Sequence, residues 1–228
     1  GLFFRGRYWT APCTTILSTC AKLWSLTGDT TYIEQALRSA ERVRRDAWNT
    51  AQIIRGRQDR IVADPPVLML QTLQARLAPD EAILLCAENS FGGVDEEEIL
   101  LAVAKHEVRF LAQRPRIGPG SGAVIEQPAQ NDFRRVYHLL YQDLYQPIAP
   151  LLAGKGRVRV FPSGYMAQVA FDALLADTTS QDIRSCAPLV ERHAFSYPLL
   201  ILSPETSKAP TAGPARYIPP HPGQGALT

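Results

Sequence analysis

The sequence lacks both the charge excess of a nucleic-acid-binding protein and the long apolar runs of a membrane-spanning one. Its 228 residues carry 24 Lys and Arg against 22 Asp and Glu, so the formal net charge is only +2. Such a balance gives no electrostatic reason to expect binding to nucleic acid or to a membrane surface. The longest purely apolar runs, such as residues 83–87, are far too short to cross a bilayer.

Cysteine is scarce and is not spaced for metal binding. The four cysteines are Cys13, Cys20, Cys86 and Cys186, and none of them forms a Cys-x-x-Cys pair. We therefore interpret each as a small buried apolar residue rather than as a metal ligand or a disulfide partner. This usage suits a reducing compartment, and we expect a cytoplasmic protein, most simply a bacterial one. The N-terminal segment has neither an initiator Met nor signal-peptide organisation, which indicates a piece of a longer chain.

Residues 8–63 have the three- and four-residue apolar spacing of amphipathic helices. Residues 27–30 interrupt this pattern. Gly28 suits the end of the first helix, and Asp29 or Thr30 suits the N-cap of the second. The second helix has a charged face, which we expect to be solvated. That face is made by Arg38, Glu41, Arg42, Arg44 and Arg45.

The middle of the chain combines one further helix with segments whose pattern fits strand or helix. Residues 64–66 mark a boundary, because their two prolines interrupt a helix, and residues 67–77 then predict a new one. The apolar run 83–87 favours a strand, although a short helix is also compatible with it. Residues 96–113 fit either structure equally. The Gly- and Pro-containing residues 114–130 predict a loop.

Residues 131–153 give the clearest helical pattern, a single apolar stripe that ends at Gly154. Pro147 lies inside this stripe and predicts a kink or a break. Residues 157–175 then have the pattern of a strand, a Pro-Ser-Gly turn and a return to the core. The proline-rich tail from Ser203 indicates disorder.

None of the motifs for metal, phosphate or serine-nucleophile chemistry is complete. His106-Glu107 begins like the zinc motif His-Glu-x-x-His, but Phe110 occupies the place of the second histidine. Residues 118–122 lack the Gly-Lys-Ser/Thr ending of a phosphate-binding loop, and Ser163 does not stand in a Gly-x-Ser-x-Gly elbow. His138 lies at the edge of an apolar stripe, where packing explains it. The sequence therefore predicts no catalytic, metal or cofactor-binding residue and no cofactor.

A repeat-like segment lies near the N-terminus. Residues 26–37 read Leu-Thr-Gly-Asp-Thr-x-Tyr-Ile-Glu-x-Ala-Leu, which resembles the turn and second helix of a tetratricopeptide repeat. One such repeat cannot bury its apolar face alone, so the resemblance implies a terminal repeat with others before it. It also implies a protein partner or protein substrate that binds through the helical repeat.

Three downstream segments resemble the CHAT domain, a caspase-like module of cysteine peptidases that often follows such repeats. They are residues 140–160, residues 157–175 (RVRVFPSGYMAQVAFDALL) and residues 189–197 (LVERHAFSY). The resemblance implies a mixed α/β fold, in which a helical hairpin precedes the first part of a caspase-like sandwich. It implies three regions: a terminal repeat over 1–65, a CHAT portion over 66–203 and a disordered tail over 204–228.

The catalytic pair of that family is absent from this chain. In CHAT-like proteins the catalytic His precedes a Gly, and the catalytic Cys lies in an Ala-Cys-x-Thr context. None of the four cysteines has that context, and no histidine precedes a Gly; the histidines are His106, His138, His193 and His221. Our hypothesis is a non-catalytic N-terminal portion of a CHAT-type peptidase, inactive alone, with repeat-mediated protein binding. The alternative is a repeat-type protein-interaction scaffold without enzymatic activity.

Overall fold

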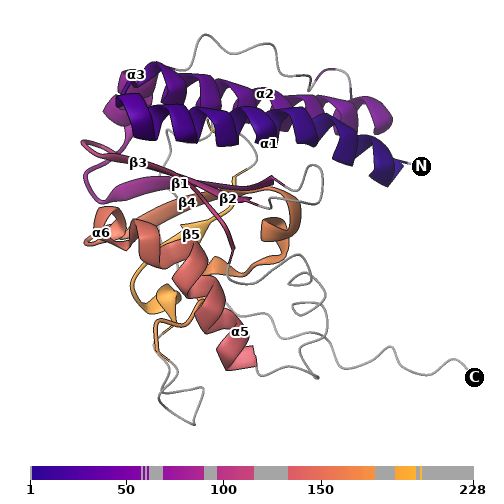
Figure 1. The fold of residues 1–228 in the computed structure, drawn as a ribbon. Coiled ribbons are helices and arrows are strands. Elements are labelled where there is room, and N and C mark those ends of the chain that lie inside the picture. The colour runs from indigo at the N-terminus through magenta and orange to yellow at the C-terminus, as the bar shows by residue number, and fades with distance from the viewer. Residues whose placement is uncertain are drawn as a thin grey trace, which may run out of the picture.

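The computed structural model describes residues 2–57, 59, 61, 69–89, 97–115, 133–177, 188–198 and 201. Its N-terminal part is a pair of long helices, α1 (Leu2–Thr27) and α2 (Thr31–Ile54), which lie side by side in opposite directions (Figure 1). Gly28 ends α1 with a φ of +69°, which confirms its predicted role. The cap of α2 comes from Asp29, whose Oδ1 accepts the Thr31 N–H at 2.9 Å.

A five-stranded mixed sheet forms the centre of the molecule. It shows that the segments whose pattern fitted either strand or helix are strands. Residues 83–87 belong to a strand, and residues 97–113 form two strands with His106 in the turn between them. The sheet order is β3-β2-β1-β4-β5; β1–β2 and β2–β3 pair antiparallel, whereas β1–β4 and β4–β5 pair parallel. The strands are β1 (Glu81–Asn89), β2 (Glu97–Ala104), β3 (Val108–Gln113), β4 (Arg157–Pro162) and β5 (Ala194–Ser196).

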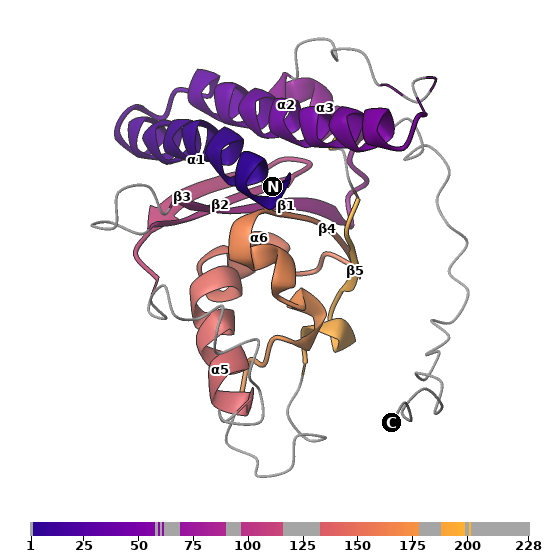
Figure 2. The same ribbon diagram turned by 90° about the vertical axis from the view of Figure 1, so that its right-hand side faces the viewer.

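Helices cover both faces of the sheet (Figures 1 and 2). The hairpin of α1 and α2, together with α3 (Leu70–Arg76), lies on one face, and α5 (Phe133–Leu140) and α6 (Ala149–Leu152) lie on the other. Alternate residues of β1 enter the two cores, since Ile83 and Leu85 pack under the hairpin while Leu84 and Cys86 pack against α5 and α6. A sheet buried on both faces explains the nearly continuous apolar runs of β1 and β2.

The predicted break at Pro147 is confirmed. After α5 the chain makes a π-helical turn (Tyr141–Tyr145) and a short 3-10 turn (Gln146–Ile148) before α6 begins. Proline has no N–H and cannot bond to the carbonyl four residues earlier, which is that of Asp143. That carbonyl instead accepts a hydrogen bond from Gln113 Nε2 of β3 at 2.7 Å. The irregular turn thus binds the helix to the edge of the sheet.

The helical hairpin and the sheet share one hydrophobic core. Cys13 and Leu17 of α1, Leu37 of α2, and Ile83 and Phe161 of the sheet belong to a single buried cluster. The division into regions 1–65, 66–203 and 204–228 stays a prediction. The boundary residues 64–66, most of the predicted loop 114–130, Cys186 and the tail from residue 204 lie outside the described residues.

Candidate functional site

The charged face of α2 is divided between solvent and the interior. Arg38 and Arg42 are exposed, as predicted. The prediction is wrong for Glu41 and Arg45, which are only 3% and 4% exposed, and for Arg44, which is partly buried. The physical reason is that other parts of the chain pack against α2 beyond its apolar stripe. Ile201 is one of them, and its N–H donates to Glu41 Oε2 at 2.8 Å. The chain beyond β5 therefore reaches the face of the sheet that α1 and α2 cover.

Arg44 connects α2 to the carboxyl end of β4. Its Nη2 donates to the carbonyl of Pro162 at 2.9 Å, and its guanidinium carbon lies 5.2 Å from the ring centroid of Phe161. Burial lowers the pKa of Arg44, and the carboxylate of Glu41 partly offsets this effect. The guanidinium still keeps its charge, because arginine titrates far above neutral pH. A partly desolvated cation therefore lies at the carboxyl end of a parallel strand.

Other polar contacts hold the hairpin on the α/β part. Lys22 Nζ of α1 lies 2.6 Å from Glu97 Oε1 at the start of β2, and the hydroxyl of Ser18 donates to the other oxygen of Glu97. Glu34 Oε1 of α2 accepts the N–H of Leu70 at 3.0 Å, which caps the start of α3. These contacts come from both helices and reach two different elements, β2 and α3. They fix the orientation of the hairpin as well as its position.

A cavity of about 130 Å³ lies between the hairpin and the carboxyl ends of β1 and β4. In open α/β sheets this end of parallel strands is where ligands most often bind. The lining is mainly apolar, and Arg44 is the charged residue in it. The two helices and the strand ends all contribute to the wall, among them Cys13, Leu17, Val43, Ala47, Ala87 and Ser163.

The described thiols are not suited to nucleophilic chemistry. Burial raises the pKa of Cys13 to about 11, against a lowering effect of Arg44. Burial also raises the pKa of Cys20, and that of Cys86 well above its ordinary value, with a smaller contribution from Glu98 at Cys86. The thiolate is the reactive form, so these groups are almost entirely protonated at neutral pH. The sequence interpretation of these three cysteines as buried residues is confirmed.

His193 forms a buried polar pair with Tyr145 on the other side of the sheet. Its Nδ1 lies 2.5 Å from the carbonyl of Lys155, and its Nε2 lies 2.6 Å from the hydroxyl of Tyr145. A carbonyl can only accept, so Nδ1 carries the proton and Nε2 accepts from the phenol. The π-helical turn places Tyr145 in this contact, and the pair anchors the chain just before β5. Sequence reasoning gave no role to His193 beyond its place in a family-like segment.

Packing, turn formation or exposure accounts for the other residues considered as candidates, His138, His106 and Ser163. His138 Nδ1 lies 3.0 Å from the carbonyl of Leu175 and its Nε2 lies 2.8 Å from Gln142 Nε2, so both ring nitrogens are engaged. His106 is exposed in the turn between β2 and β3. Ser163 bonds to the carbonyl of Cys86 through its N–H at 2.9 Å and its hydroxyl at 3.3 Å. These contacts belong to packing and turn formation, as the sequence predicted for His106 and Ser163.

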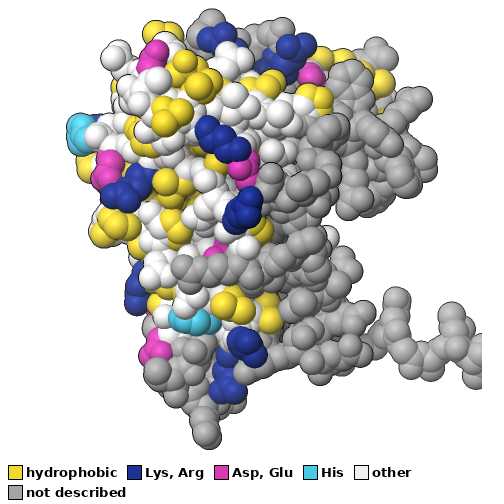
Figure 3. Space-filling view, viewed as in Figure 1, with side chains coloured by type: hydrophobic (Ala, Val, Ile, Leu, Met, Phe, Trp, Pro, Cys, Tyr) yellow, Lys and Arg dark blue, Asp and Glu magenta, His cyan; other side chains and the backbone are white. Residues whose placement is uncertain are grey.

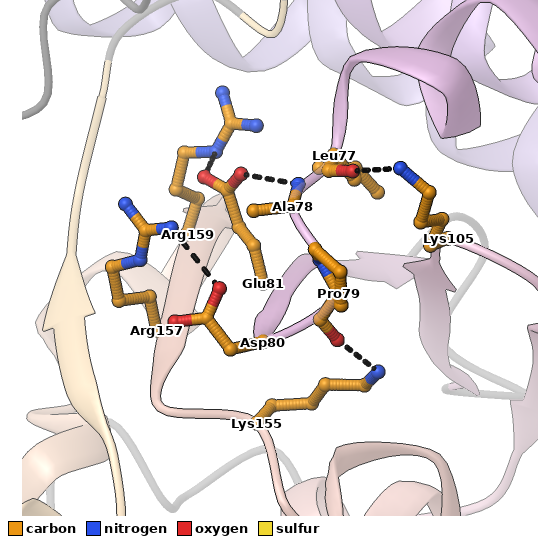
Figure 4. A network of polar contacts seen from close by, with 9 residues as sticks. All are labelled: Leu77, Ala78, Pro79, Asp80, Glu81, Lys105, Lys155, Arg157 and Arg159. Carbon is orange, nitrogen blue, oxygen red and sulfur yellow. Dashed lines mark hydrogen bonds and ion pairs between the residues drawn. The ribbon is translucent and has the colours of Figure 1, made fainter.

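A second polar network lies at the amino ends of β1 and β4, away from the cavity (Figure 4). Asp80 pairs with Arg157 at 3.1 Å and Glu81 with Arg159 at 2.8 Å. Lys155 Nζ donates to the carbonyl of Pro79 at 2.7 Å, which fixes the same loop. The hydrogen bond from Arg157 lowers the pKa of Asp80. Both carboxylates are paired with arginines of β4, so the network holds β1 in register with β4 and leaves neither carboxylate free.

One cation and one apolar cavity thus lie on the hairpin side of the sheet, and two engaged imidazoles lie on the other side; the described residues contain no thiol–imidazole pair. In this described part, no cluster of three or more His, Cys, Asp or Glu could hold a metal ion. No described helix is both long enough and apolar enough to cross a membrane. Comparison with known proteins adds no relative: no protein-family model matches the chain, and no curated protein sequence matches it either.

Proposed function

We propose that this chain is a non-catalytic N-terminal portion of a CHAT-type, caspase-like cysteine peptidase whose helical hairpin binds a protein partner or substrate. The observation that carries the proposal is the strand arrangement. β1, β4 and β5 run parallel beside the β1–β2–β3 meander, and helices cover both faces. A caspase-like sandwich would have this mixed, three-layered organisation. Its further strands would add beyond β5, at the edge of the sheet.

The segments with family resemblance are neighbours in space, which supports the proposal. Residues 140–160 form the π-helical turn, α6 and most of β4, and residues 189–197 include β5, which pairs with β4 from Arg157 to Arg159. The Pro-Ser-Gly turn follows β4 at the same edge as the cavity.

The non-catalytic part of the proposal rests on the partners of the titratable groups. His138 and His193 each use both ring nitrogens within the protein, and neither has a cysteine among these partners. A cysteine peptidase needs a thiolate and an imidazole within hydrogen-bond reach. The buried thiols Cys13 and Cys86 have raised pKa values, opposite to what a nucleophile requires.

The outer face of the hairpin is the surface proposed for protein binding. Apolar side chains lie exposed on it, and in the view of Figure 3 basic side chains lie scattered among them rather than in one patch. Ile16 is 38% and Leu26 81% exposed on α1, and Ile54 is 61% exposed at the end of α2. A protein interface combines an apolar core with a polar rim, and these exposed apolar groups would supply the core. The same face would serve the alternative, a repeat-type scaffold without a peptidase.

Photo-crosslinking tests the binding surface. A photoreactive residue is placed at Arg42 on the exposed face of α2, or at Arg109 on β3 as a matched control, in cells that produce the protein. We expect a specific crosslinked protein from position 42 and none from position 109. Equal crosslinking from both positions, or none from either, would contradict binding through the hairpin.

A second measurement separates the two functions. An antibody to this region gives the mass of the native product, and peptide sequencing gives its composition. A product containing the His-Gly and Ala-Cys-x-Thr motifs supports the peptidase portion. A product of only these 228 residues leaves the scaffold as the function. In either case, the isolated chain should hydrolyse no peptide, and hydrolysis that depends on one of its cysteines would overturn the non-catalytic assignment.

A further inference from the structure

Two arginines, Arg157 and Arg159, lie side by side on one face of β4. They alternate with Val158 and Val160, which belong to the core on the α5 side. Since successive side chains of a strand point to opposite faces, both arginines lie on the face that the helical hairpin covers. Their side chains are 44% and 13% exposed. The proposed function uses neither of these charges.

Each arginine contacts one carboxylate and keeps further donors. Arg157 Nη2 lies 3.1 Å from Asp80 Oδ1, and Arg159 Nε lies 2.8 Å from Glu81 Oε1. A guanidinium has five N–H donors. In Figure 4 the terminal nitrogens of Arg159 point away from Glu81. The pair of Arg157 and Asp80 is exposed, and exposed ion pairs are weak, so Arg157 is also available to a second anion.

The two guanidinium groups repel each other. Burial lowers the pKa of Arg159; the carboxylate of Glu81 offsets part of this effect, and the nearby charge of Arg157 adds to it. Both groups keep their charge, because arginine titrates far above neutral pH. Lys155 Nζ donates to the carbonyl of Pro79 at 2.7 Å, which positions the ammonium group without neutralising it. An added anion at this end of β4 would therefore be attracted by three cations and relieve their repulsion.

The neighbouring strand leaves the surface beside the arginines open. In β5, Ala194 lies opposite Arg157 and Ser196 lies opposite Arg159, on the same face of the sheet. Both β5 residues are exposed. They are small and uncharged, so they neither cover the guanidinium groups nor neutralise them. We call the surface formed by Arg157, Arg159, Ala194 and Ser196 the basic strip.

The aromatic side chains of this region lie on the other face of the sheet. Phe195 packs against the core on the α5 side, and the hydroxyl of Tyr197 accepts the N–H of Phe171. Proteins that bind single-stranded nucleic acid use aromatic rings on which the bases stack. The basic strip is made of two guanidinium groups and two small side chains. A protein carboxylate requires only the guanidinium forks, so this composition favours an acidic protein segment.

We propose that the basic strip binds an acidic segment of a partner protein, with carboxylates two residues apart on Arg157 and Arg159. In an extended segment such residues share one side at a spacing of about 6.5–7 Å, which is also the spacing of the two arginines along β4. Arginine binds a carboxylate through two parallel hydrogen bonds. The basic strip is separate from the outer face of the hairpin, so this proposal and the proposed function can fail independently.

The probe is a fluorescein-labelled peptide of alternating Ser and Glu, titrated with the whole chain at about 20 mM salt and followed by fluorescence anisotropy. The comparison peptide has Gln in place of each Glu. We expect saturable binding of the acidic peptide with a Kd below roughly 1 mM, and binding of the Gln peptide weaker by about fivefold or more. Absence of saturation up to roughly 1 mM protein, or equal binding of the two peptides, would overturn the proposal.

Two variants of one residue locate the site. Ser196→Glu places a competing carboxylate beside Arg159 and leaves both arginines intact, so it should weaken binding of the acidic peptide by about fivefold or more. Ser196→Gln adds a side chain of the same size without charge and should bind the peptide like the parent. The proposal is wrong if Ser196→Glu is folded by circular dichroism and binds the peptide as tightly as Ser196→Gln does.

Two further variants test the charge itself. Arg157→Gln removes an exposed cation of the basic strip and should weaken binding by about threefold or more. Arg42→Gln removes an exposed cation from α2 and should leave binding unchanged. Equal losses for these two variants would mean that the peptide responds to overall charge and not to the basic strip, which would overturn the proposal.

Phosphate groups also fit a guanidinium fork, and an oligothymidylate with as many negative charges as the peptide tests this source. Binding of the oligothymidylate equal to or weaker than that of the acidic peptide supports a protein segment as the ligand. Clearly tighter binding would assign the basic strip to nucleic acid and overturn the proposal.

Discussion

The hydroxyl of Tyr145 lies 2.6 Å from Nε2 of His193, and both side chains are buried, at 4% and 5% exposure. The two residues are far apart in sequence: one lies in the π-helical turn between α5 and α6, and the other lies directly before β5. Because Lys155 fixes the proton of His193 on Nδ1, the tyrosine is the donor to Nε2. One hydrogen bond thus joins the helical layer to the edge strand.

Tyr145→Phe removes this donor and leaves Nε2 of His193 buried without a partner. We expect the free energy of unfolding to fall by about 1–3 kcal/mol, the usual cost of an unsatisfied buried polar group. Urea denaturation measures the change. Tyr141→Phe is the matched control, since Tyr141 stacks on Tyr145 at 5.2 Å but is only partly buried. Equal losses for the two variants would mean that the Tyr145–His193 bond contributes nothing specific.

Arg44→Leu removes the contact between α2 and the carboxyl end of β4. The carbonyl of Pro162 loses its donor, Phe161 loses the cation over its ring, and Glu41 loses a neighbouring positive charge. We expect a loss of about 1–3 kcal/mol in unfolding free energy. Arg42→Leu should change it by no more than about 0.5 kcal/mol, because Arg42 is exposed. Similar stabilities of the two variants would show that the Arg44 contact does not hold the helix.

The contribution of Glu97 to stability should depend on pH. Burial raises the pKa of Glu97, but the ion pair with Lys22 and the bond from Ser18 lower it overall, below the ordinary value of 4.5. A carboxyl group with a depressed folded-state pKa stabilises the protein above its unfolded pKa, and that stabilisation is lost as the pH falls through the folded-state pKa.

Glu97→Gln should therefore be less stable than the parent at neutral pH, by about 1 kcal/mol. The difference should shrink as the pH falls through the carboxyl range. Denaturation curves across this range measure it. Glu107→Gln is the control, because Glu107 is about half exposed in the β2–β3 turn and its contact with Arg109 is long, at 3.5 Å. A difference that stays constant down to acid pH would contradict a role for the ionised carboxyl.

The described cysteines should react slowly in the folded protein. The pKa of Cys13 rises from 9.0 to about 11, so at pH 8 its thiolate fraction falls by roughly 100-fold, and burial limits access further. Labelling with a thiol reagent, mapped by mass spectrometry, should be slow at Cys13, Cys20 and Cys86 until the chain unfolds. The denatured protein provides the control. Rapid labelling of any of these three at neutral pH would reveal an activated thiol that the structure does not explain.

Local patterns predicted the regular elements well. The helix break at Pro147 and the end of α1 at Gly28 follow from the chemistry of proline and glycine, which acts over a few residues. The apolar run in β1 also indicated a strand, but its helical alternative could be excluded only by its partners on β2 and β4. A strand buried on both faces has no polar–apolar alternation that a sequence pattern could detect.

The candidate site could not be predicted in this way. Arg44 and Arg42 are two residues apart on one helix, yet one faces the sheet and the other faces solvent. Charge patterning placed both in water, because it takes no account of what packs against the helix. The cavity likewise depends on Cys13, Arg44 and Ser163, which come from three distant parts of the chain. Their approach follows from tertiary packing alone.

The central strand β1 sets an order in which the molecule can assemble. Leu84 pairs with Ala102 across a local meander and with Val160 on a strand much further along the chain. Closing the long loop to β4 costs more chain entropy than forming the meander, so β1–β2–β3 should form early in folding and β4 should dock late. The anchor of Arg44 and the cavity beside it exist only once β4 is in place. They should therefore form late in folding and be lost when β4 leaves the sheet.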